Sequence, residues 1–250
     1  MLNNFTQLFV DKNDYLKGML RLDFYNHNFW PSCPFIRLQK MSRSIVNRAA
    51  QSFIDFCIDC LTEEGYLYFI VDMNSISMYN EDHHRVHDIF IYGIDTDKKI
   101  FFAADNFKDG VYSYEEIPFE QLIEGYNAVD KLKLEDWLDG VRIISYNKQN
   151  MFWGIKQDYK FDLDKFVDEL GDYLTSSITV KRYHAPYEQW MLYGSDLAFG
   201  LEIYDNLINY MTKVNNKYDL RPFYVLWEHK KLMPGFEMHI SGCPTEEGES

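Results

Sequence analysis

Hydrophobic and polar residues in the first 146 positions follow the pattern of β-strands joined by polar turns. Short apolar runs alternate with clusters of Asp, Asn, Lys and Gly, which is the spacing expected of strands in a sheet. The most strongly apolar run is Tyr66–Val71. The predicted strands cover residues 5–10, 19–25, 66–71, 83–95, 98–106, 112–117 and 141–146.

Helical spacing marks two segments among these strands. From Ser42 to Glu64 apolar residues recur every three to four positions, which predicts one long amphipathic helix ending at Gly65. Pro118 suits the first position of a second helix, over residues 119–126. Between strand and helix, Trp30–Pro34 is expected to form a rigid turn.

The second part of the chain is predicted to be mainly helical, with its last helix stopped by Pro234-Gly235. Its predicted helices cover residues 162–174, 195–213 and 223–232. A seam near 147–160 divides the chain into an α+β core, 1–146, and a helical part, 147–250, unless the two form one continuous domain. The fold class is therefore α+β, with an antiparallel sheet packed on helices.

The composition describes a folded, acidic protein of 250 residues. A hydrophobic fraction of 46% is sufficient for a core. The net charge of −14 argues against nucleic acid or an anionic membrane as the main partner, because both select a concentrated basic surface. The charge is compatible with a cationic or amine-bearing small molecule, and the more economical interpretation is simple solubility. With no signal-peptide pattern and no apolar run of membrane-spanning length, a cytoplasmic location is expected.

One basic cluster departs from this acidic balance near the start of the long predicted helix. Its members are Arg37, Lys40, Arg43 and Arg48. The cluster could face an acidic carrier protein; the alternative is a solvated helix face.

The cysteines predict a reduced protein without a metal site. Cys57 and Cys60 form a C-x-x-C pair inside the long predicted helix, and no second pair stands at zinc-binding spacing. A redox C-x-x-C normally begins a helix, so both are interpreted as small buried hydrophobic residues. Cys243 lies close to an acidic C-terminal tail and is not a catalytic candidate.

The fourth and fifth predicted strands carry the most suggestive chemistry. His87 stands directly before the alternating run Ile89, Ile91, Gly93, and Asp105 lies near the end of the next strand. If the strands pair as a hairpin, the two side chains meet as a general base and the carboxylate that orients it. Imidazole titrates near neutrality, as a general base requires. The alternative is that His87 only caps its strand.

The neighbouring polar residues offer competing interpretations. His83, His84 and His87 together suggest a metal, but no nearby Cys or Glu completes a ligand spacing, so one functional histidine with two exposed ones is more economical. Three residues compete with Asp105 for the orienting role: Asp88, Asp95 and Asn106. Of these, Asp95 is expected to be structural, in the turn between the strands.

Cys33 is the leading candidate nucleophile. It lies just before Pro34, where a helix or turn could begin and lower the pKa of the thiol through its N-terminal dipole. The alternative is a buried turn cysteine beside Trp30 and Phe35.

These features resemble a papain-like family named after the N-terminal domain of butirosin biosynthesis protein H. That family is related in fold to the peptidases that trim bacteriocin leader sequences, and it occurs in firmicute natural-product gene clusters. The resemblance covers about two-thirds of the chain. The similar segments are Trp30–Pro34, the helix leading to Gly65, Tyr66–Asp72, His87–Asp95, Phe102–Gly110, Asp219–Phe223 and Leu226–Lys231.

The resemblance implies a papain-like fold with a Cys-His-Asp site that moves an acyl group from a carrier-protein thioester to an amine. By this resemblance, the catalytic histidine of the family corresponds to His87 and its catalytic acid to Asp105. In the family the cysteine follows a glutamine and opens a helix well upstream of the histidine, whereas no cysteine precedes Trp30 here. Either Cys33 has taken over that role, or the protein is inactive, or its N-terminus is shortened.

The expected function is that of an acyltransferase or amide-forming enzyme in a peptide-like antibiotic or other natural-product pathway. Cys33 would attack the thioester, His87 would accept the proton of the thiol and later of the amine, and Asp105 would orient His87. The expected partners are an acyl or peptidyl carrier protein and an amine-bearing small molecule, with no cofactor. The alternatives are an inactive binding or scaffold module and a cysteine peptidase.

Overall fold

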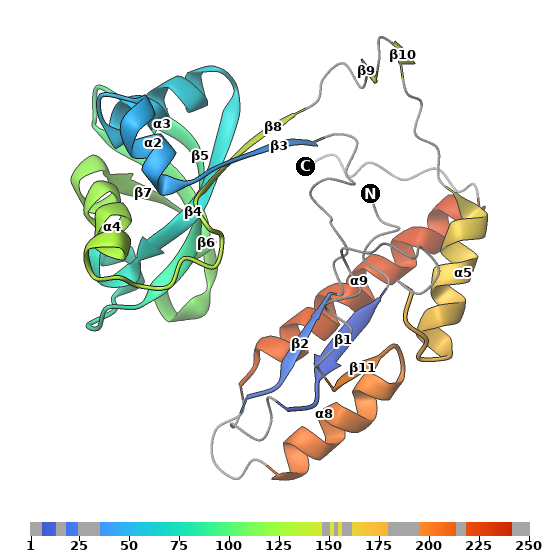
Figure 1. Ribbon diagram of the computed structural model, residues 1–250. Helices are drawn as coiled ribbons and strands as arrows, with labels where there is room; N and C mark the ends of the chain where they lie inside the picture. The colour runs from blue at the N-terminus through green and yellow to red at the C-terminus, as the bar shows by residue number, and fades with distance from the viewer. Residues whose placement is uncertain are drawn as a thin grey trace, which may run out of the picture. The chain divides into compact units, whose positions relative to one another are not determined.

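The computed structural model shows a mixed α+β protein (Figure 1). The residues it describes are 7–13, 19–24, 36–146, 151–152, 155–156, 162–179, 196–213 and 219–241. These residues contain antiparallel sheets and six α-helices, which confirms the predicted α+β class. None of the helices in these ranges is long and apolar enough to cross a membrane.

The chain divides into two compact units, residues 30–157 and residues 1–29 together with 158–250. The sequence predicts a single division after residue 146, so the assignment of the first 29 residues differs. The cause is strand pairing, because β1 (Leu8–Asp11) pairs with β11 (Leu197–Phe199) near the other end of the chain.

A six-stranded antiparallel sheet forms the centre of the unit 30–157. In spatial order its strands are β3 (Ile36–Met41), β8 (Val141–Tyr146), β4 (Gly65–Asp72), β5 (Val86–Asp95), β6 (Ile100–Asn106) and β7 (Tyr112–Pro118). Five of them match predicted strands. β3 has no predicted counterpart, because its polar residues Arg37, Gln39 and Lys40 are those of an exposed edge strand.

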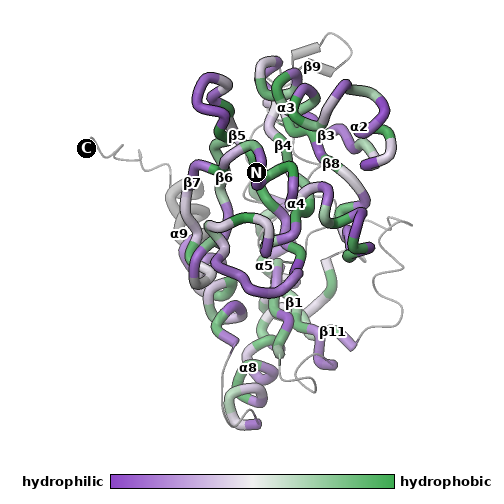
Figure 2. Tube along the Cα trace, turned by 90° about the vertical axis from the view of Figure 1, so that its left-hand side faces the viewer, coloured by the Kyte–Doolittle hydropathy of each residue, from purple (hydrophilic) through white to green (hydrophobic). Residues whose placement is uncertain are grey.

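Helices cover one face of this sheet and bury a largely aromatic and aliphatic core. They are α2 (Arg43–Ala49), α3 (Phe53–Thr62) and α4 (Phe119–Lys131). Phe69 of β4 and Ile89 of β5 are fully buried on this face, and Phe53 stacks on Tyr126 with ring centroids 3.6 Å apart. Figure 2 shows hydrophobic and hydrophilic residues alternating along these elements.

A β-bulge in β5 decides which of its side chains face this core. Gly93 pairs with Phe102, whereas Ile91 pairs with the very next residue of β6, so Tyr92 is an extra residue in the strand. Successive residues of a strand face opposite sides of the sheet. One extra residue therefore reverses the face of every residue before it, relative to the neighbouring strand. The bulge leaves His87 on the core face with Ile89 and Ile91. Gly93 lies on the opposite face, although the predicted alternation placed it on the same face as Ile89 and Ile91.

The single helix predicted over residues 42–64 is wrong, because the structure has two helices, α2 and α3. Between them Ala50 (φ −114°, ψ 162°) and Ser52 (φ −148°, ψ 164°) are extended. Ser52 Oγ accepts a hydrogen bond from the backbone N–H of Asp55 at 3.1 Å and donates one to Asp55 Oδ2 at 2.7 Å. This reciprocal capping starts a new helix, which the uninterrupted apolar spacing concealed.

We expect Ser52→Ala to lower the free energy of unfolding by about 1 kcal/mol, because the Asp55 N–H loses its acceptor. Ser42→Ala is the matched control, since Ser42 also precedes a helix but makes no capping hydrogen bond. Urea unfolding of both variants measures the difference. Equal losses from the two substitutions would contradict a capping role for Ser52.

The predicted basic cluster is not one surface, because Arg43 is buried, with 7% of its side chain exposed. Its Nε lies 2.8 Å from Asp136 Oδ2, its Nη1 donates to the Tyr126 carbonyl at 2.9 Å, and its Nη2 donates to the Ile70 carbonyl. Arg43 therefore links β4, α4 and the segment before β8. The other three members of the cluster are exposed: Arg37, Lys40 and Arg48.

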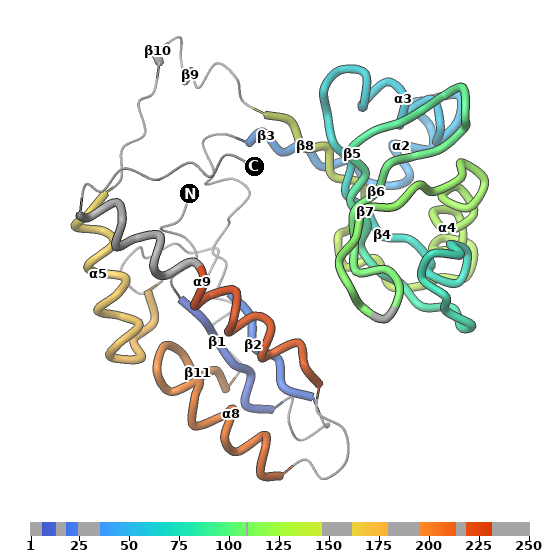
Figure 3. The backbone as a smooth tube through the Cα atoms, turned by 180° about the vertical axis from the view of Figure 1, so that it is seen from behind, coloured from blue at the N-terminus to red at the C-terminus, as the bar shows by residue number. Residues whose placement is uncertain are grey.

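The second unit packs helices on a three-stranded sheet in the order β11-β1-β2. α8 contacts β1 and β11, and α9 contacts β2, as Figure 3 shows. Leu8 and Val10 of β1 are fully buried in this second core. The other strands and α-helices in the described residues are β2 (Arg21–Phe24), β9 (Met151–Phe152), β10 (Ile155–Lys156), α5 (Leu163–Leu174), α8 (Glu202–Lys213) and α9 (Arg221–Ser241).

Two predicted helix boundaries in this unit are wrong. The segment 195–213 begins with strand β11 and turns at Gly200, which has φ +53° and would meet the Tyr173 carbonyl oxygen if it carried a Cβ. A left-handed glycine of this kind ends one element and allows α8 to begin. The last helix continues past Pro234 to Ser241, because a proline removes one helical N–H donor without necessarily ending the helix.

Candidate active site

His87 and Asp105 meet, as their predicted strand pairing requires. His87 Nδ1 lies 2.9 Å from Asp105 Oδ2 and 3.0 Å from the Asp88 carbonyl oxygen. Both neighbours are hydrogen-bond acceptors, so Nδ1 carries the proton and donates it. Nε2 is then the basic nitrogen of the neutral ring, and no residue in the described ranges is hydrogen-bonded to it. The predicted contact is confirmed, and the catalytic role of the pair stays a prediction.

Burial makes Asp105 a fixed partner for a more accessible histidine. The Asp105 side chain is 6% exposed and that of His87 is 32% exposed. Asp105 Oδ1 accepts the backbone N–H of Asn106 at 2.6 Å, and Oδ2 also accepts the hydroxyl of Tyr79. A carboxylate held by three donors cannot rotate away from the imidazole, which is what an orienting group requires.

The electrostatics of the pair favour a protonated imidazole. The hydrogen bond to Asp105 raises the pKa of His87 above its usual 6.5, with a smaller opposing effect of burial. Burial, followed by the charge of Asp105, raises the pKa of Tyr79 far above the usual range. Tyr79 therefore keeps its proton and acts only as a donor to the carboxylate.

We expect Asp105→Asn to lower the pKa of His87, since it removes the group that contributes most to the rise. Because the folded-state pKa is raised, the pair's stabilisation is fully present below the unfolded value of about 6.5 and is lost as pH rises through the folded-state pKa. The variant should therefore lose more unfolding free energy, relative to wild type, below about pH 6.5 than above the folded-state pKa of His87. An NMR titration of the histidine rings, with urea unfolding in each of these two pH ranges, checks the prediction. An unchanged His87 titration would contradict it.

The three residues that competed for the orienting role have other partners. Asp88 offers its carbonyl to His87, while its carboxylate accepts the Tyr68 hydroxyl. Asp95 accepts the backbone N–H groups of Asp97 and Lys98 at 3.1 and 2.9 Å, which confirms its structural place in the turn. Asn106 contributes a backbone N–H to Asp105.

A second histidine–aspartate pair lies close along the chain and was missed in the sequence. His84 Nδ1 lies 2.9 Å from Oδ2 of Asp72, which is fully buried at the end of β4. Asp72 also accepts the Ser75 hydroxyl at 3.0 Å and the Arg85 N–H at 3.1 Å. His84 is thus not a free loop histidine, although it is largely exposed. Within the described ranges, no group of three or more His, Cys, Asp or Glu side chains is arranged to hold a metal ion.

The two described cysteines are poor nucleophiles. Cys57 is fully buried, and burial raises the pKa of its thiol well above the usual value. Burial also raises the pKa of the half-buried Cys60 to about 11. Both lie within α3 and remain protonated at neutral pH, as expected of small hydrophobic residues. Cys33 and Cys243 lie outside the described residues.

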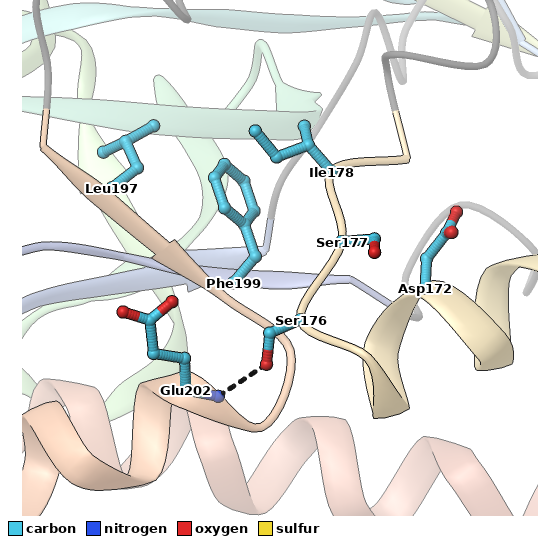
Figure 4. A pocket seen from close by; sticks show the side chains of 7 residues that line it. All are labelled: Asp172, Ser176, Ser177, Ile178, Leu197, Phe199 and Glu202. Atoms are coloured by element: carbon cyan, nitrogen blue, oxygen red, sulfur yellow. Dashed lines mark hydrogen bonds between the residues drawn. The ribbon is translucent and has the colours of Figure 1, made fainter.

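A pocket of about 490 Å³ lies in the second unit (Figure 4). Its lining residues are Asp172, Ser176, Ser177, Ile178, Leu197, Phe199 and Glu202. Ser176 Oγ accepts the Glu202 N–H at 3.0 Å, and the Glu202 carboxylate pairs with Lys12 at 2.9 Å. These two polar groups connect segments of the second unit.

Comparison of the chain with protein-family models, with curated proteins and with solved structures finds no match. The side chains themselves therefore carry the functional argument. An oriented imidazole with an available Nε2 can take a proton from a nucleophile and return it to a leaving group. Such a site suits acyl transfer or hydrolysis.

Proposed function

We propose that the chain is a papain-like acyltransferase that moves an acyl group from a carrier-protein thioester to an amine. The observation that carries the proposal is the 2.9 Å contact between His87 Nδ1 and the buried Asp105, which leaves Nε2 as the basic nitrogen. The sequence resemblance supplies the reaction class, and Cys33 supplies the nucleophile.

In the first half of the reaction, His87 Nε2 accepts the proton of the Cys33 thiol. The thiolate attacks the thioester carbonyl, and backbone N–H groups near Cys33 would stabilise the resulting oxyanion. The C–S bond to the carrier then breaks, and the imidazolium returns the proton to the carrier thiolate. The acyl group is left on Cys33 as a new thioester.

In the second half, an amine attacks this acyl-enzyme and His87 accepts the proton that the amine loses. Collapse of the tetrahedral adduct forms the amide bond and breaks the bond to Cys33 Sγ, which recovers its proton from His87. The net charge of −14 favours a cationic amine over an anionic acceptor. Asp105 accepts the hydrogen bond of Nδ1 in both halves and stabilises each imidazolium.

The test uses the full chain with an acyl N-acetylcysteamine thioester as donor and a panel of primary amines as acceptors. Amide formation that is lost in Cys33→Ala, His87→Ala and Asp105→Asn supports the proposal. Activity that survives all three substitutions removes it. Release of free acid without amide would favour the cysteine peptidase alternative.

We also expect iodoacetamide to alkylate Cys33 faster than Cys57 or Cys60, because His87 would hold a fraction of the Cys33 thiol as thiolate. Peptide mass spectrometry of samples taken over time measures the rates. The Cys33 rate should fall in His87→Ala, while the Cys57 and Cys60 rates provide an internal control. Uniformly slow alkylation would favour an inactive binding module.

A further inference from the structure

Tyr79 shares one oxygen of Asp105 with His87. Its hydroxyl donates to Asp105 Oδ2, the same atom that lies 2.9 Å from His87 Nδ1. Two donors of different chemistry therefore converge on one carboxylate oxygen. Any change in one of these hydrogen bonds alters the charge available to the other.

The backbone around Tyr79 fixes the position of its hydroxyl. Tyr79 ends the 3₁₀-helix η4 (Ser77–Tyr79) and is 5% exposed. At the start of η4, the backbone N–H and Oγ of Ser77 each lie 3.0 Å from Gln121 Oε1 on α4. The Tyr79 ring packs on Phe107, with ring centroids 4.9 Å apart. The phenol therefore reaches Asp105 from a segment anchored to the helix layer.

We propose that Tyr79 is a positioning residue that holds Asp105 toward His87 and limits the basicity of the imidazole by sharing its carboxylate oxygen. The kinetic part of this inference rests on the proposed function; the effect on His87 itself does not. Without the phenol, Oδ2 would concentrate its negative charge on the imidazolium and bind the proton of His87 more tightly. A general base works best when it releases its proton readily near neutral pH.

Other charged groups near His87 and Asp105 also influence the basicity of the imidazole. The charged groups that influence His87 are Asp105 from β6 and Asp88 from β5. Asp88 is itself bound by the Tyr68 hydroxyl from β4, with Arg142 of β8 close to that phenol. Tyr68 is therefore a natural control, because it is a second partly buried tyrosine that donates to a neighbouring carboxylate but not to Asp105.

The experiment is an NMR titration of the histidine rings in the full chain, compared between wild type, Tyr79→Phe and Tyr68→Phe. Tyr79→Phe keeps the ring that packs on Phe107 and removes only the hydroxyl. We expect it to raise the pKa of His87, with a smaller change in Tyr68→Phe. An unchanged or lowered His87 pKa in Tyr79→Phe, or an equal rise in Tyr68→Phe, would overturn the inference.

A double-mutant cycle tests whether the Tyr79 hydroxyl acts on His87 through the Asp105 carboxylate. In an Asp105→Asn background the hydroxyl has no carboxylate to share, so Tyr79→Phe should leave the pKa of His87 unchanged. A shift of the same size in both backgrounds would show that the hydroxyl does not act through the Asp105 carboxylate, and it would overturn the inference. In the unmodified protein, a nuclear Overhauser contact between the Tyr79 hydroxyl proton and His87 Nδ1–H should also be present, and its absence would count against the shared oxygen.

The kinetic consequence is tested separately. We expect Tyr79→Phe to reduce kcat for acyl transfer by about tenfold with little change in KM, the lower end of the scale for a hydrogen bond to a charged group. If no acyl transfer occurs in the wild type, the proposed reaction fails while the titration still decides the role of Tyr79. If transfer occurs but the titrations do not differ, the reaction stands and the positioning role fails.

Discussion

His87→Ala is expected to lower the rate of acyl transfer by about 10²- to 10⁴-fold, the usual contribution of a positioned general base. The substitution removes Nε2, which accepts the nucleophile's proton and delivers it to the leaving group. Asp105 would remain in place, bound by the Asn106 N–H and the Tyr79 hydroxyl. The loss should therefore fall on kcat and leave the fold intact, as thioester turnover and circular dichroism of the same sample would show.

His83→Ala is the matched control for this prediction. His83 is an exposed histidine of the same segment. The two histidine–aspartate hydrogen bonds of this segment are made by His84 and His87. Its substitution should leave the rate within about twofold of wild type, since exposed side chains without special contacts contribute little. Equal losses from His83→Ala and His87→Ala would contradict the assignment of His87 as the base.

The largest expected stability effect is that of Arg43→Ala, at about 3–5 kcal/mol. The guanidinium binds the carboxylate of Asp136 and the carbonyl oxygens of Tyr126 and Ile70 from a buried position. It also lies over the Tyr126 ring, with its central carbon 4.2 Å from the ring centroid. Its removal would leave a poorly solvated carboxylate and two carbonyls without their donor, which is why the cost exceeds that of an ordinary ion pair.

Lys40→Ala is the control for Arg43→Ala. Lys40 Nζ lies 2.9 Å from Asp139 Oδ2, but both side chains are exposed, so the pair should contribute at most about 1 kcal/mol. Hydrogen exchange of the β4 amides measures the unfolding free energy of this unit without averaging over the whole chain. If Arg43→Ala costs no more than Lys40→Ala, the buried guanidinium is not the structural link inferred here.

The contact between His87 and Asp105 could be predicted because it depends on local features. A polar turn joins two apolar strands, and antiparallel pairing brings the start of one beside the end of the other. That the two side chains share a face of the sheet could not be predicted so simply, because the register of Gly93 with Phe102, continued without an extra residue, would leave them on opposite faces. It depends on the bulge at Tyr92, which reverses the alternation of β5, and nothing in the apolar pattern marks that extra residue.

The elements that the sequence misassigned share a physical cause, which is local capping or long-range pairing within an uninterrupted hydrophobic pattern. Ser52 starts a new helix where the apolar spacing continues unbroken. Gly200 ends β11 where helical spacing alone predicts one helix. The pairing of β1 with β11 places Phe9 opposite Phe199, 190 residues further along the chain, which no local pattern encodes.

The hydrogen-bond partners of Asp105 and His84 that come from irregular segments could not be predicted from the sequence either. Tyr79 lies on a short 3₁₀-helix 26 residues before Asp105, and Asp72 lies 12 residues before His84. Both depend on where loops return to the sheet. A signal for Asp72 was present, because an aspartate at the end of a strongly apolar strand is a candidate for a buried hydrogen-bonded carboxylate.

The most direct test of the central claim is to trap the acyl-enzyme. The full chain is mixed briefly with an acyl N-acetylcysteamine thioester, quenched in acid and analysed by peptide mass spectrometry. We predict one added acyl group, located on Cys33, that forms at least about 100-fold more slowly in His87→Ala. An acyl group on another cysteine, or labelling of Cys33 at the same rate without His87, would contradict the proposed mechanism.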